Sequence, residues 1–424
     1  MRILYLMAAM MLALSTFAAR IETDRTWYLA GEAMKVSVVT DDALIAYAEL
    51  CDTYSMAAGI VMSLEGGKGT GTIELPADLH SGYYVLSVYT RDNANVTHRL
   101  VAVVNPLLRS EDDDIEWVSI PDVDSLSYSA TREGERLSAA DLADEKPVDI
   151  RETEGHIIKA RIRNVYGGTT YRSHQINPSL SIVGKQIHYF EGKMVNDSTA
   201  LFFTFGLHGK QPLVLSAATY TGESLPIEMI SPFAALLPKK LPHLVFHYNR
   251  SEVEARSMDM QRHQIAITPA KRELQLGDYA DDTAVDGVPL DYDETVFGTK
   301  PDLSYNLDEY RQFRTINEVL TEYVQLVKRV KIKGVPQLVV RKEDEAYDGS
   351  WPAMVFIDGM PVINIDRLLN YDARRIHYIN IYANLYTFGN CVYRGILSFV
   401  TRSGRLTNYP TEPNVQYLVY EFPE

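Results

Sequence analysis

Residues 83–90, YYVLSVYT, decide the fold of the first part of the chain. Aromatic and β-branched residues of this kind are typical of strands, and the Ser81-Gly82 pair before them is a turn signal. Near the N-terminus Met34, Val36 and Val38 stand at alternate positions, the period of a strand with one buried face. Further β-type runs separated by glycines fill residues 22–104. We therefore expect an antiparallel β-sandwich over this segment.

One glycine-rich run in the same segment invites a different interpretation. Gly66-Gly67-Lys68-Gly69 has the composition of a phosphate-binding loop, but the Gly-Lys-Ser/Thr ending and a following helical pattern are missing. The run therefore predicts a hairpin turn.

The segment also resembles a known family. Its opening, DRTWYLAGE at residues 24–32, and its closing strands, Leu75-Pro76 and SGYYVLSVYT at residues 81–90, are similar to a macroglobulin-type immunoglobulin-like domain. Macroglobulins that carry a thioester trap proteases through a Gly-Cys-Gly-Glu-Gln motif. Neither Cys51 nor Cys391 stands in such a context, so the resemblance implies the fold and not that activity.

Residues 151–235 contain further short β-type runs, at 156–162, 200–205, 213–219 and 227–230, and predict a second β-sandwich. Two acidic, weakly periodic segments flank it. We expect residues 105–150 to be an acidic linker and residues 236–300 to be a connector, because runs of carboxylates are typical of solvated chain.

Residues 301–406 combine helical and strand patterns and predict a small α+β domain. Thr315-Ile-Asn-Glu318 is a capping box, and the apolar residues after it follow the helical period. We expect a helix over 316–328, a helical turn over 365–369, and strands over 337–341, 353–357, 376–382 and 396–401. The expected fold class is mainly β, with tandem antiparallel sandwiches followed by this C-terminal α+β domain.

The C-terminal domain carries a second resemblance. The run MVFIDGMPV at residues 354–362, the strand after the short helix and the run GILSFVT at 395–401 are similar to the plug domain of TonB-dependent outer-membrane receptors. A receptor's plug is followed by a large membrane-embedded domain, whereas 20 residues follow Gly404 here. The resemblance implies a plug-like domain, with residues 407–424 as a tail, in a protein that is not itself a transport channel.

Composition excludes several classes of function. The 424 residues carry 41 Lys and Arg against 56 Asp and Glu, a formal charge of -15, which argues against nucleic-acid binding. Two Cys exclude a disulfide-dense scaffold, and we expect Cys51 and Cys391 to be separate buried thiols, although an oxidising compartment permits a bridge. The 46% of apolar residues is too high for a disordered chain.

The first 18 residues have the pattern of a secretory signal peptide. Arg2 precedes an apolar run at 3–14, and small residues stand at Thr16 and Ala18, before the expected cleavage point. The run is shorter than the roughly 20 residues that span a bilayer, and no Cys follows it to accept a lipid. We expect an exported protein of a Gram-negative cell, periplasmic or associated with the outer membrane, without a lipid anchor or a transmembrane segment in the mature chain.

Four motifs match metal or catalytic sites only in part. His243 and His247 have the spacing of metal ligands on a helix, but Leu244 stands where a His-Glu-x-x-His protease has Glu. Asp282, Asp286-Gly287 and Asp293 match a calcium loop only in part, and the acidic run at 111–124 lacks ligand spacing. Asp358-Gly359 is interpreted as a turn. We expect no catalytic residue, no metal ligand and no cofactor.

These observations favour a non-enzymatic envelope protein that binds a protein partner in the outer membrane or at the cell surface. Two alternatives stay open at this point. One is a secreted hydrolase whose site residues are scattered along the sequence. The other is a protein that captures proteases without a thioester. The sequence alone names neither the partner nor the binding face.

Overall fold

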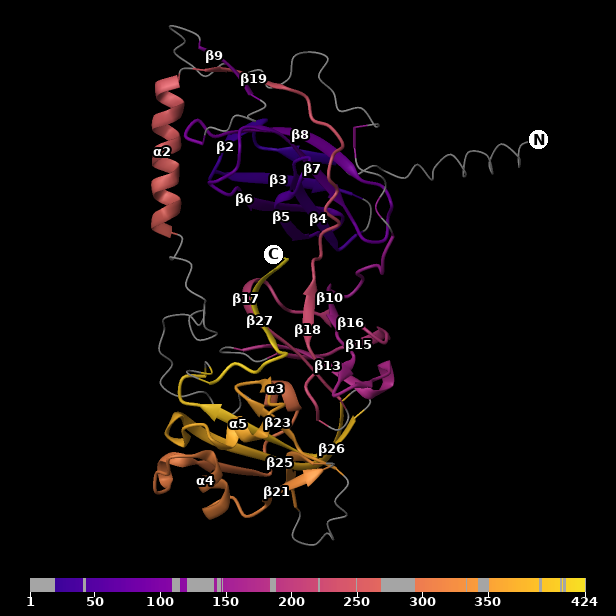
Figure 1. Cartoon of the computed structure of the whole chain (residues 1–424), viewed down its shortest axis with the longest axis vertical. Helices are drawn as coiled ribbons and strands as arrows, with labels where there is room; N and C mark the ends of the chain where they lie inside the picture. The colour runs from indigo at the N-terminus through magenta and orange to yellow at the C-terminus, as the bar shows by residue number, and fades with distance from the viewer. Residues whose placement is uncertain are drawn as a thin grey trace, which may run out of the picture. The chain divides into compact units, whose positions relative to one another are not determined.

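The computed structural model describes residues 20–40, 43–108, 115–119, 141–142, 146, 148–183, 188–219, 222–248, 250–267, 294–332, 334–341, 351–388, 391–404, 406 and 409–423 (Figure 1). The protein is mainly β, as predicted. The chain forms two compact units, and each contains segments that are distant in the sequence. Unit 1 comprises Met1–His156, Phe233–Arg272 and Glu421–Glu424; unit 2 comprises Ile157–Pro232 and Glu273–Tyr420. The second and third predicted regions therefore belong to one unit.

Unit 1 contains the first predicted sandwich. A three-stranded sheet of order β1-β3-β6 faces a five-stranded sheet of order β2-β8-β7-β4-β5, and all neighbours are antiparallel except β2 and β8. Met34, Val36 and Val38 point into the core between the sheets, as the alternation predicted. The strands are β1 (Arg20–Thr23), β2 (Trp27–Leu29), β3 (Ala33–Val39), β4 (Ile45–Cys51), β5 (Met56–Ser63), β6 (Lys68–Glu74), β7 (Gly82–Tyr89) and β8 (Thr97–Val104).

The glycine run between β5 and β6 is a hairpin turn, as predicted. Gly66 and Gly67 have φ of 57° and 75°, a left-handed backbone that glycine adopts without strain. Glu65 and Lys68 exchange both backbone hydrogen bonds across the turn. Because β6 follows at once and pairs with β3, the run leads into a strand and not into the helix that follows a phosphate-binding loop.

The five-stranded sheet is covered on both faces. Every residue of β4 and β7 is buried, and the face directed away from the sandwich core is covered by later parts of the chain. Phe233 and Leu236 pack against Tyr47 and Tyr89 on this outer face. The predicted connector of 236–300 therefore completes the core of unit 1, because these strands are apolar on both faces and need a second cover.

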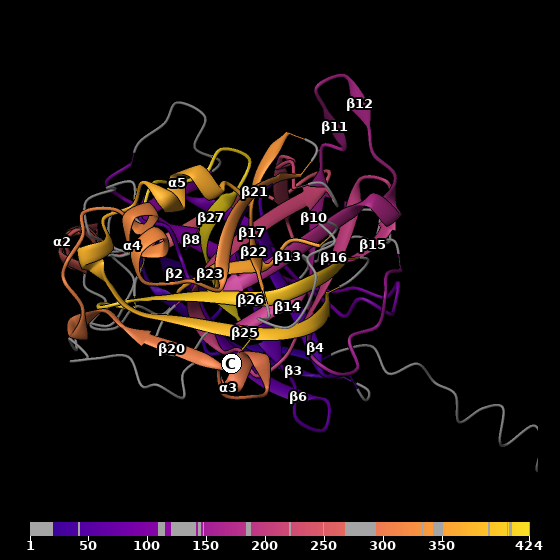
Figure 2. The same cartoon turned by 90° about the horizontal axis from the view of Figure 1, so that it is seen from below.

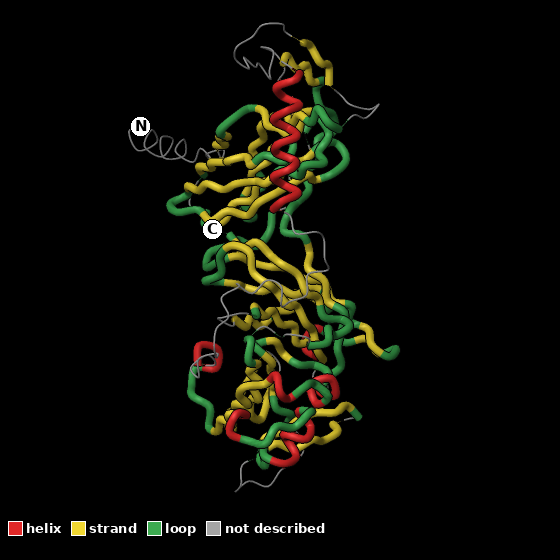
Figure 3. The backbone as a smooth tube through the Cα atoms, turned by 90° about the vertical axis from the view of Figure 1, so that its left-hand side faces the viewer, coloured by secondary structure: helices red, strands yellow, loops and turns green. Residues whose placement is uncertain are grey.

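The same connector supplies helix α2 (Arg250–Ile267), which runs beside the strands of the first sandwich in Figure 3. Val253 of the helix is buried against Leu29, Tyr83 and Ala102. Arg256 pairs with the buried Glu32. Strand β19 (Leu244–Tyr248) pairs in parallel with β9 (Ile115–Ser119) from the predicted linker of 105–150. Both segments therefore contain regular structure where the sequence predicted none.

Unit 2 contains the second sandwich. One sheet has the order β15-β16-β10-β18 and the other β14-β13-β17-β27. Hairpin β11–β12 projects from it in Figure 2. The elements are β10 (His156–Ile162), β11 (Val165–Tyr166), β12 (Thr169–Thr170), a 3₁₀ turn (Ser173–Gln175), β13 (Ile176–Ile182), β14 (His188–Glu191), β15 (Lys193–Asn196), β16 (Thr199–Thr204), β17 (Gly209–Thr219), β18 (Ile227–Ile230) and β27 (Gln416–Phe422).

Strand β27 corrects the prediction of a C-terminal tail at 407–424. It lies beside β17 and completes the second sandwich, although almost two hundred residues separate the two strands in the sequence. Backbone N–H of Met229 also donates to the side-chain oxygen of Gln416, at 2.7 Å. The tail was missed because its partner strand belongs to a distant part of the chain.

The remainder of unit 2 is the predicted α+β region. A five-stranded sheet of order β20-β25-β26-β23-β24 is antiparallel except between β23 and β26, and hairpin β21–β22 lies beside it. The elements are α3 (Glu294–Phe297), β20 (Leu303–Asn306), a 3₁₀ turn (Leu307–Glu309), α4 (Ile316–Glu322), β21 (Val327–Ile332), β22 (Val335–Val340), β23 (Met354–Ile357), β24 (Met360–Pro361), α5 (Ile365–Leu369), a 3₁₀ turn (Ala373–Arg375), β25 (Ile376–Phe388) and β26 (Cys391–Thr401).

Helix α4 begins as predicted and ends early. The Thr315 side chain accepts from the backbone N–H of Glu318, and Glu318 accepts from that of Thr315, so the capping box is present. The helix ends at Glu322 instead of residue 328, because Val327 already pairs with Val340 in the β21–β22 hairpin. The β-branched side chains of this segment favour a strand, and both valines are buried in the core of unit 2.

Candidate functional site

The Asp358-Gly359 motif is a structural turn between β23 and β24. Asp358 has φ of 46° and is fully buried. Its carboxylate accepts from the backbone N–H and the hydroxyl of Thr401, at 2.7 and 2.6 Å, and from the backbone N–H of Leu406, at 2.9 Å. These bonds hold the end of β26 against the turn. A carboxylate engaged in this way serves folding, which agrees with the interpretation made from the sequence.

The two histidines of the predicted metal motif lie in extended chain. His243 immediately precedes strand β19, and His247 is inside it. Four residues of strand span roughly 13 Å, so the helical spacing on which this metal motif depends is absent. Of the acidic motifs, residues 111–114, 122 and 124 and Asp282, Asp286-Gly287 and Asp293 lie outside the described residues. Within the described part, no group of three His, Cys, Asp or Glu side chains is placed to hold a metal.

Cys51 is a free thiol buried at the end of β4. Burial, with the charges of Glu49 and Asp52 nearby, raises the pKa of this thiol to about 12. The thiol therefore stays protonated and is a poor nucleophile. Cys391 belongs to β26 in the other unit, and its side chain lies outside the described part of the structure.

A buried cluster of ionisable groups fastens a later segment to unit 1. Glu152 accepts from the Tyr47 hydroxyl, at 2.7 Å, and pairs with the Arg91 guanidinium, at 3.1 Å, and with Nδ1 of His156, at 3.0 Å. All four side chains are buried. Because each polar group has a partner within the cluster, it joins strand β4 to the segment that leads into β10 rather than forming an open site.

The histidine of this cluster gives a pH prediction. Burial lowers the pKa of His156 below its usual 6.5, although the Glu152 carboxylate opposes this shift. The unfolded chain then takes up a proton more readily than the folded one, so this contribution to stability is present above about pH 6.5 and is lost as the pH falls below it. We expect His156→Gln to reduce the drop in melting temperature between about pH 7.5 and pH 5.5. An equal drop in the wild type and the variant would show that His156 does not cause it.

A second cluster is open to solvent and lies in unit 2. Four half-buried aromatic rings from β20, the loop before α4 and the end of α4 are in contact: Tyr305, Tyr310, Phe313 and Tyr323. The ring centroids of Tyr310 and Tyr323 are 4.7 Å apart, and those of Phe313 and Tyr323 are 5.4 Å apart. Contacts of this kind hold the rings in place and reduce the entropy lost when a partner binds.

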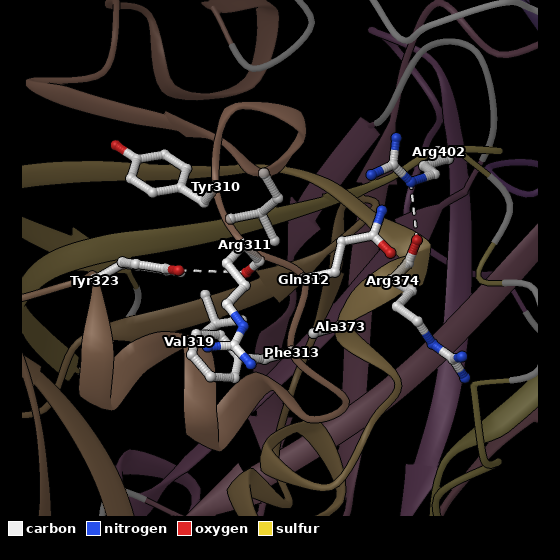
Figure 4. Close-up of a pocket in the computed structure, with 10 residues that line it drawn as sticks. Tyr310, Arg311, Gln312, Phe313, Val319, Tyr323, Ala373, Arg374 and Arg402 are labelled. Carbon is white, nitrogen blue, oxygen red and sulfur yellow. Dashed lines mark hydrogen bonds between the residues drawn. The ribbon is translucent and has the colours of Figure 1, made fainter.

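Three arginines border the rings, Arg311, Arg374 and Arg402 (Figure 4). We call the four rings and these arginines the aromatic–arginine surface. In the close-up, Tyr310 and Tyr323 lie on one side, and Arg374 and Arg402 on the other. Nε of Arg402 donates to the backbone oxygen of Arg374, at 2.8 Å, and the Tyr323 hydroxyl donates to that of Arg311, at 3.4 Å. The arginines come from the loop before α4, the 3₁₀ turn and the chain after β26.

The charges of this surface are unevenly matched. Arg402 pairs with Asp308, at 2.6 Å, and Arg374 pairs with Asp372, at 2.6 Å. Both carboxyl groups consequently have pKa values below their usual 3.8, chiefly through the hydrogen bond to the arginine. Arg311 is exposed and makes no side-chain ion pair with any described residue. One cation of the surface is therefore available to an acidic group of a partner.

The hollow among these residues is about 10 Å³, enough for one water molecule. The surface is therefore suited to side chains of another protein and not to an enclosed small molecule. Tyrosine and arginine are the residues most enriched at energetic centres of protein interfaces. This surface was not predicted from the sequence, because its members are spread between residues 305 and 402. The run YRQFR at 310–314 is the one local signal.

Comparison with known proteins gives no family assignment. No protein-family model matches the chain, and no curated protein matches it. Among solved structures, alpha-2-macroglobulin from Escherichia coli, activated by trypsin, is similar at 11% identity, with 52% of this chain and 16% of that chain covered and a TM-score of 0.19. The Escherichia coli adhesin FdeC is similar at 13% identity, with 55% of this chain and 65% of that chain covered and a TM-score of 0.18.

The sulfur carrier protein SoxY from Chlorobium limicola matches at 14% identity, with a TM-score of 0.15; 23% of this chain and 96% of that chain are covered. This chain spans less than two thirds of the macroglobulin and of the adhesin. All these TM-scores are below 0.5. A separate observation concerns membranes: within the described residues, no helix has the length and apolar character needed to span a bilayer.

Proposed function

We propose that this chain is an exported, non-enzymatic protein of the cell envelope that binds a protein partner through the aromatic–arginine surface. The observation that carries the proposal is the group of four contacting aromatic rings, half-buried and bordered by the exposed Arg311. Fixed aromatic rings supply apolar contact area at a low entropic cost, and an arginine without an ion pair supplies orientation.

The charges define the partner's chemistry. Asp308 and Asp372 are engaged by Arg402 and Arg374, so the surface presents apolar rings and the positive charge of Arg311. A matching segment carries apolar side chains beside at least one carboxylate. Nucleic acid does not match, because a basic face with many phosphate contacts is absent from this surface and the whole chain has a formal charge of -15.

Two parts of this proposal are supported by sequence patterns: the location of the partner and the type of the C-terminal domain. The signal-peptide pattern of residues 1–18 supports export, and the run at 354–362 supports a plug-like domain and hence a partner in the outer membrane or at the cell surface. The absence of a recognisable catalytic motif favours a binding role over a hydrolase or a protease trap.

The test is affinity capture from Gram-negative envelope extracts with four forms of the chain: the wild type, Tyr310→Ala, Arg311→Glu and the control Arg163→Glu. Arg163 is exposed and follows β10 of the second sandwich, whereas the aromatic–arginine surface is built from the C-terminal α+β region. We expect one protein to be captured by the wild type and the control and to be lost in both surface variants. Equal capture by all four forms would refute the proposal that this surface is the binding site.

A further inference from the structure

A separate cavity of about 110 Å³ lies within unit 2, between strands of the second sandwich and the C-terminal sheet. Ser179 of β13 and Ser216 of β17 line it on the sandwich side, and Gln337 of β22 and Met354 of β23 line it on the other. One water molecule needs at least about 10–15 Å³ of such space, so the cavity has room for several waters or for a small organic molecule.

The lining of this cavity is polar and carries no formal charge. None of the described residues that line it is Asp, Glu, Lys, Arg or His, although 23% of the chain is charged. The polar groups are amides and hydroxyls: Asn177, Ser179, Ser216, Thr219 and Gln337. Ser179, Ser216 and Thr219 are at most 6% exposed, so their hydroxyl groups lie inside the fold.

Two of these groups are fixed and one lacks a partner. The hydroxyls of Ser179 and Ser216, which face each other in the β13–β17 register, are 2.7 Å apart and hydrogen-bonded. The Nδ2 atom of Asn177 is buried and has no hydrogen-bond partner among the described residues. A buried donor without an acceptor is destabilising, and an acceptor on a bound molecule offsets that cost.

Apolar and aromatic side chains complete the wall. Tyr189 and Tyr393 line the cavity and pack against the apolar cluster of Met354 and Phe356. A cavity lined by both hydrogen-bonding groups and aromatic rings matches a molecule that has hydroxyl groups around an apolar carbon ring.

Other ligand classes fit less well. A charged ligand would lose its hydration without gaining an opposite charge from the described lining. A purely apolar ligand would leave the amides and hydroxyls without partners. We propose that this cavity binds one neutral saccharide residue, held by the amides of Asn177 and Gln337 and by ring contacts with Tyr189 and Tyr393. Such a residue is either a free monosaccharide or the end of a glycan.

The test is calorimetric titration of the full chain with D-glucose, D-galactose and N-acetylglucosamine, and with glucuronate as the charged comparison. We expect saturable binding of at least one neutral sugar, and binding at least tenfold weaker for glucuronate. Gln337→Met retains the shape of the side chain and removes its hydrogen bonds, and we expect it to weaken binding at least fivefold. Thr170→Ala, on the exposed β11–β12 hairpin, is the matched control and should bind as the wild type does.

The source of the sugar is decided by a second titration with a short oligosaccharide that ends in the bound sugar. Tighter binding of the oligosaccharide indicates a glycan end, and equal or weaker binding indicates a free monosaccharide. No binding by any neutral sugar, equal binding by Gln337→Met with unchanged melting temperature, or preference for glucuronate would overturn the inference. The aromatic–arginine surface is tested separately, with the captured protein and the Tyr310 and Arg311 variants. A failure of sugar binding at the cavity and a failure of partner binding at that surface are therefore distinguishable.

Discussion

Asp358→Ala is expected to lower the free energy of unfolding of unit 2 by about 3–5 kcal/mol. The substitution removes the acceptor for three donors at once: the backbone N–H and hydroxyl of Thr401 and the backbone N–H of Leu406. Asp358 is fully buried, so water does not replace the lost acceptor. Its φ of 46° adds to the loss, because alanine tolerates this backbone less well than aspartate.

The measurement is hydrogen exchange of peptides from β25 and β26, with two comparison variants. Asp358→Asn keeps the preference for the left-handed backbone and one acceptor oxygen, so it should lie between alanine and the wild type. Asp366→Ala removes an exposed carboxylate that pairs with Arg329 on the surface, and should cost less than about 1 kcal/mol. If Asp358→Ala and Asp366→Ala had the same small effect, the turn would not depend on the Asp358 carboxylate.

Glu152→Ala is the second large expected effect, in unit 1. It leaves the Arg91 guanidinium, which is 7% exposed, without its carboxylate, and also removes the acceptor for the Tyr47 hydroxyl. Breaking one side of a buried ion pair costs about 3–5 kcal/mol, because the remaining charge stays buried after its carboxylate is lost. We expect a loss of this size, with the earliest exchange in peptides of β4 and in the segment before β10.

The matched control for this prediction is Glu154→Ala, two residues away in the same segment. Glu154 is exposed, so its removal should change stability by less than about 0.5 kcal/mol. Glu152→Gln, which keeps the shape and one acceptor, should be milder than alanine. A wild-type exchange pattern in Glu152→Ala would mean that the Tyr47, Arg91 and His156 cluster does not hold this segment in place.

The sequence predicts the positions of individual strands correctly. It does not predict which distant segments pair with them or cover them. The alternation at Met34, Val36 and Val38 identified a strand and its buried face, because side chains of a strand alternate between two faces. The near-continuous apolar run at 83–89 became β7, which is buried on both faces. Nothing in that run shows what covers the second face. The cover comes from Phe233 and Leu236, about 150 residues later.

The errors at α4 and the C-terminus have the same cause. The apolar residues at 324 and 327 fit a helical period, but Val327 is paired with Val340 by a hairpin whose second strand follows later. The predicted tail contains β27, whose neighbour β17 ends at Thr219. Periodicity shows which face of a helix or strand is apolar. It does not show which distant segment of the chain packs or pairs with it.

The functional surfaces were harder to predict than the fold. The negative conclusions drawn from the histidine pair and from Asp358 rested on local spacing, which a sequence displays directly. The aromatic–arginine surface joins Tyr305, Tyr310 and Tyr323 to Arg402, and this grouping exists because β20, β25 and β26 are neighbours in one sheet. The expected export and the plug-like domain stay predictions from the sequence.

The most direct test of the proposed function is the dissociation constant of the captured envelope protein for the purified wild-type chain and its Arg311→Glu and Arg163→Glu variants. Reversing the charge of Arg311, which makes no ion pair with any described residue, should weaken binding at least tenfold, equivalent to about 1.4 kcal/mol. Arg163→Glu should bind within about twofold of the wild type. The same dissociation constant for all three chains would contradict the claim that this chain binds its partner through the aromatic–arginine surface.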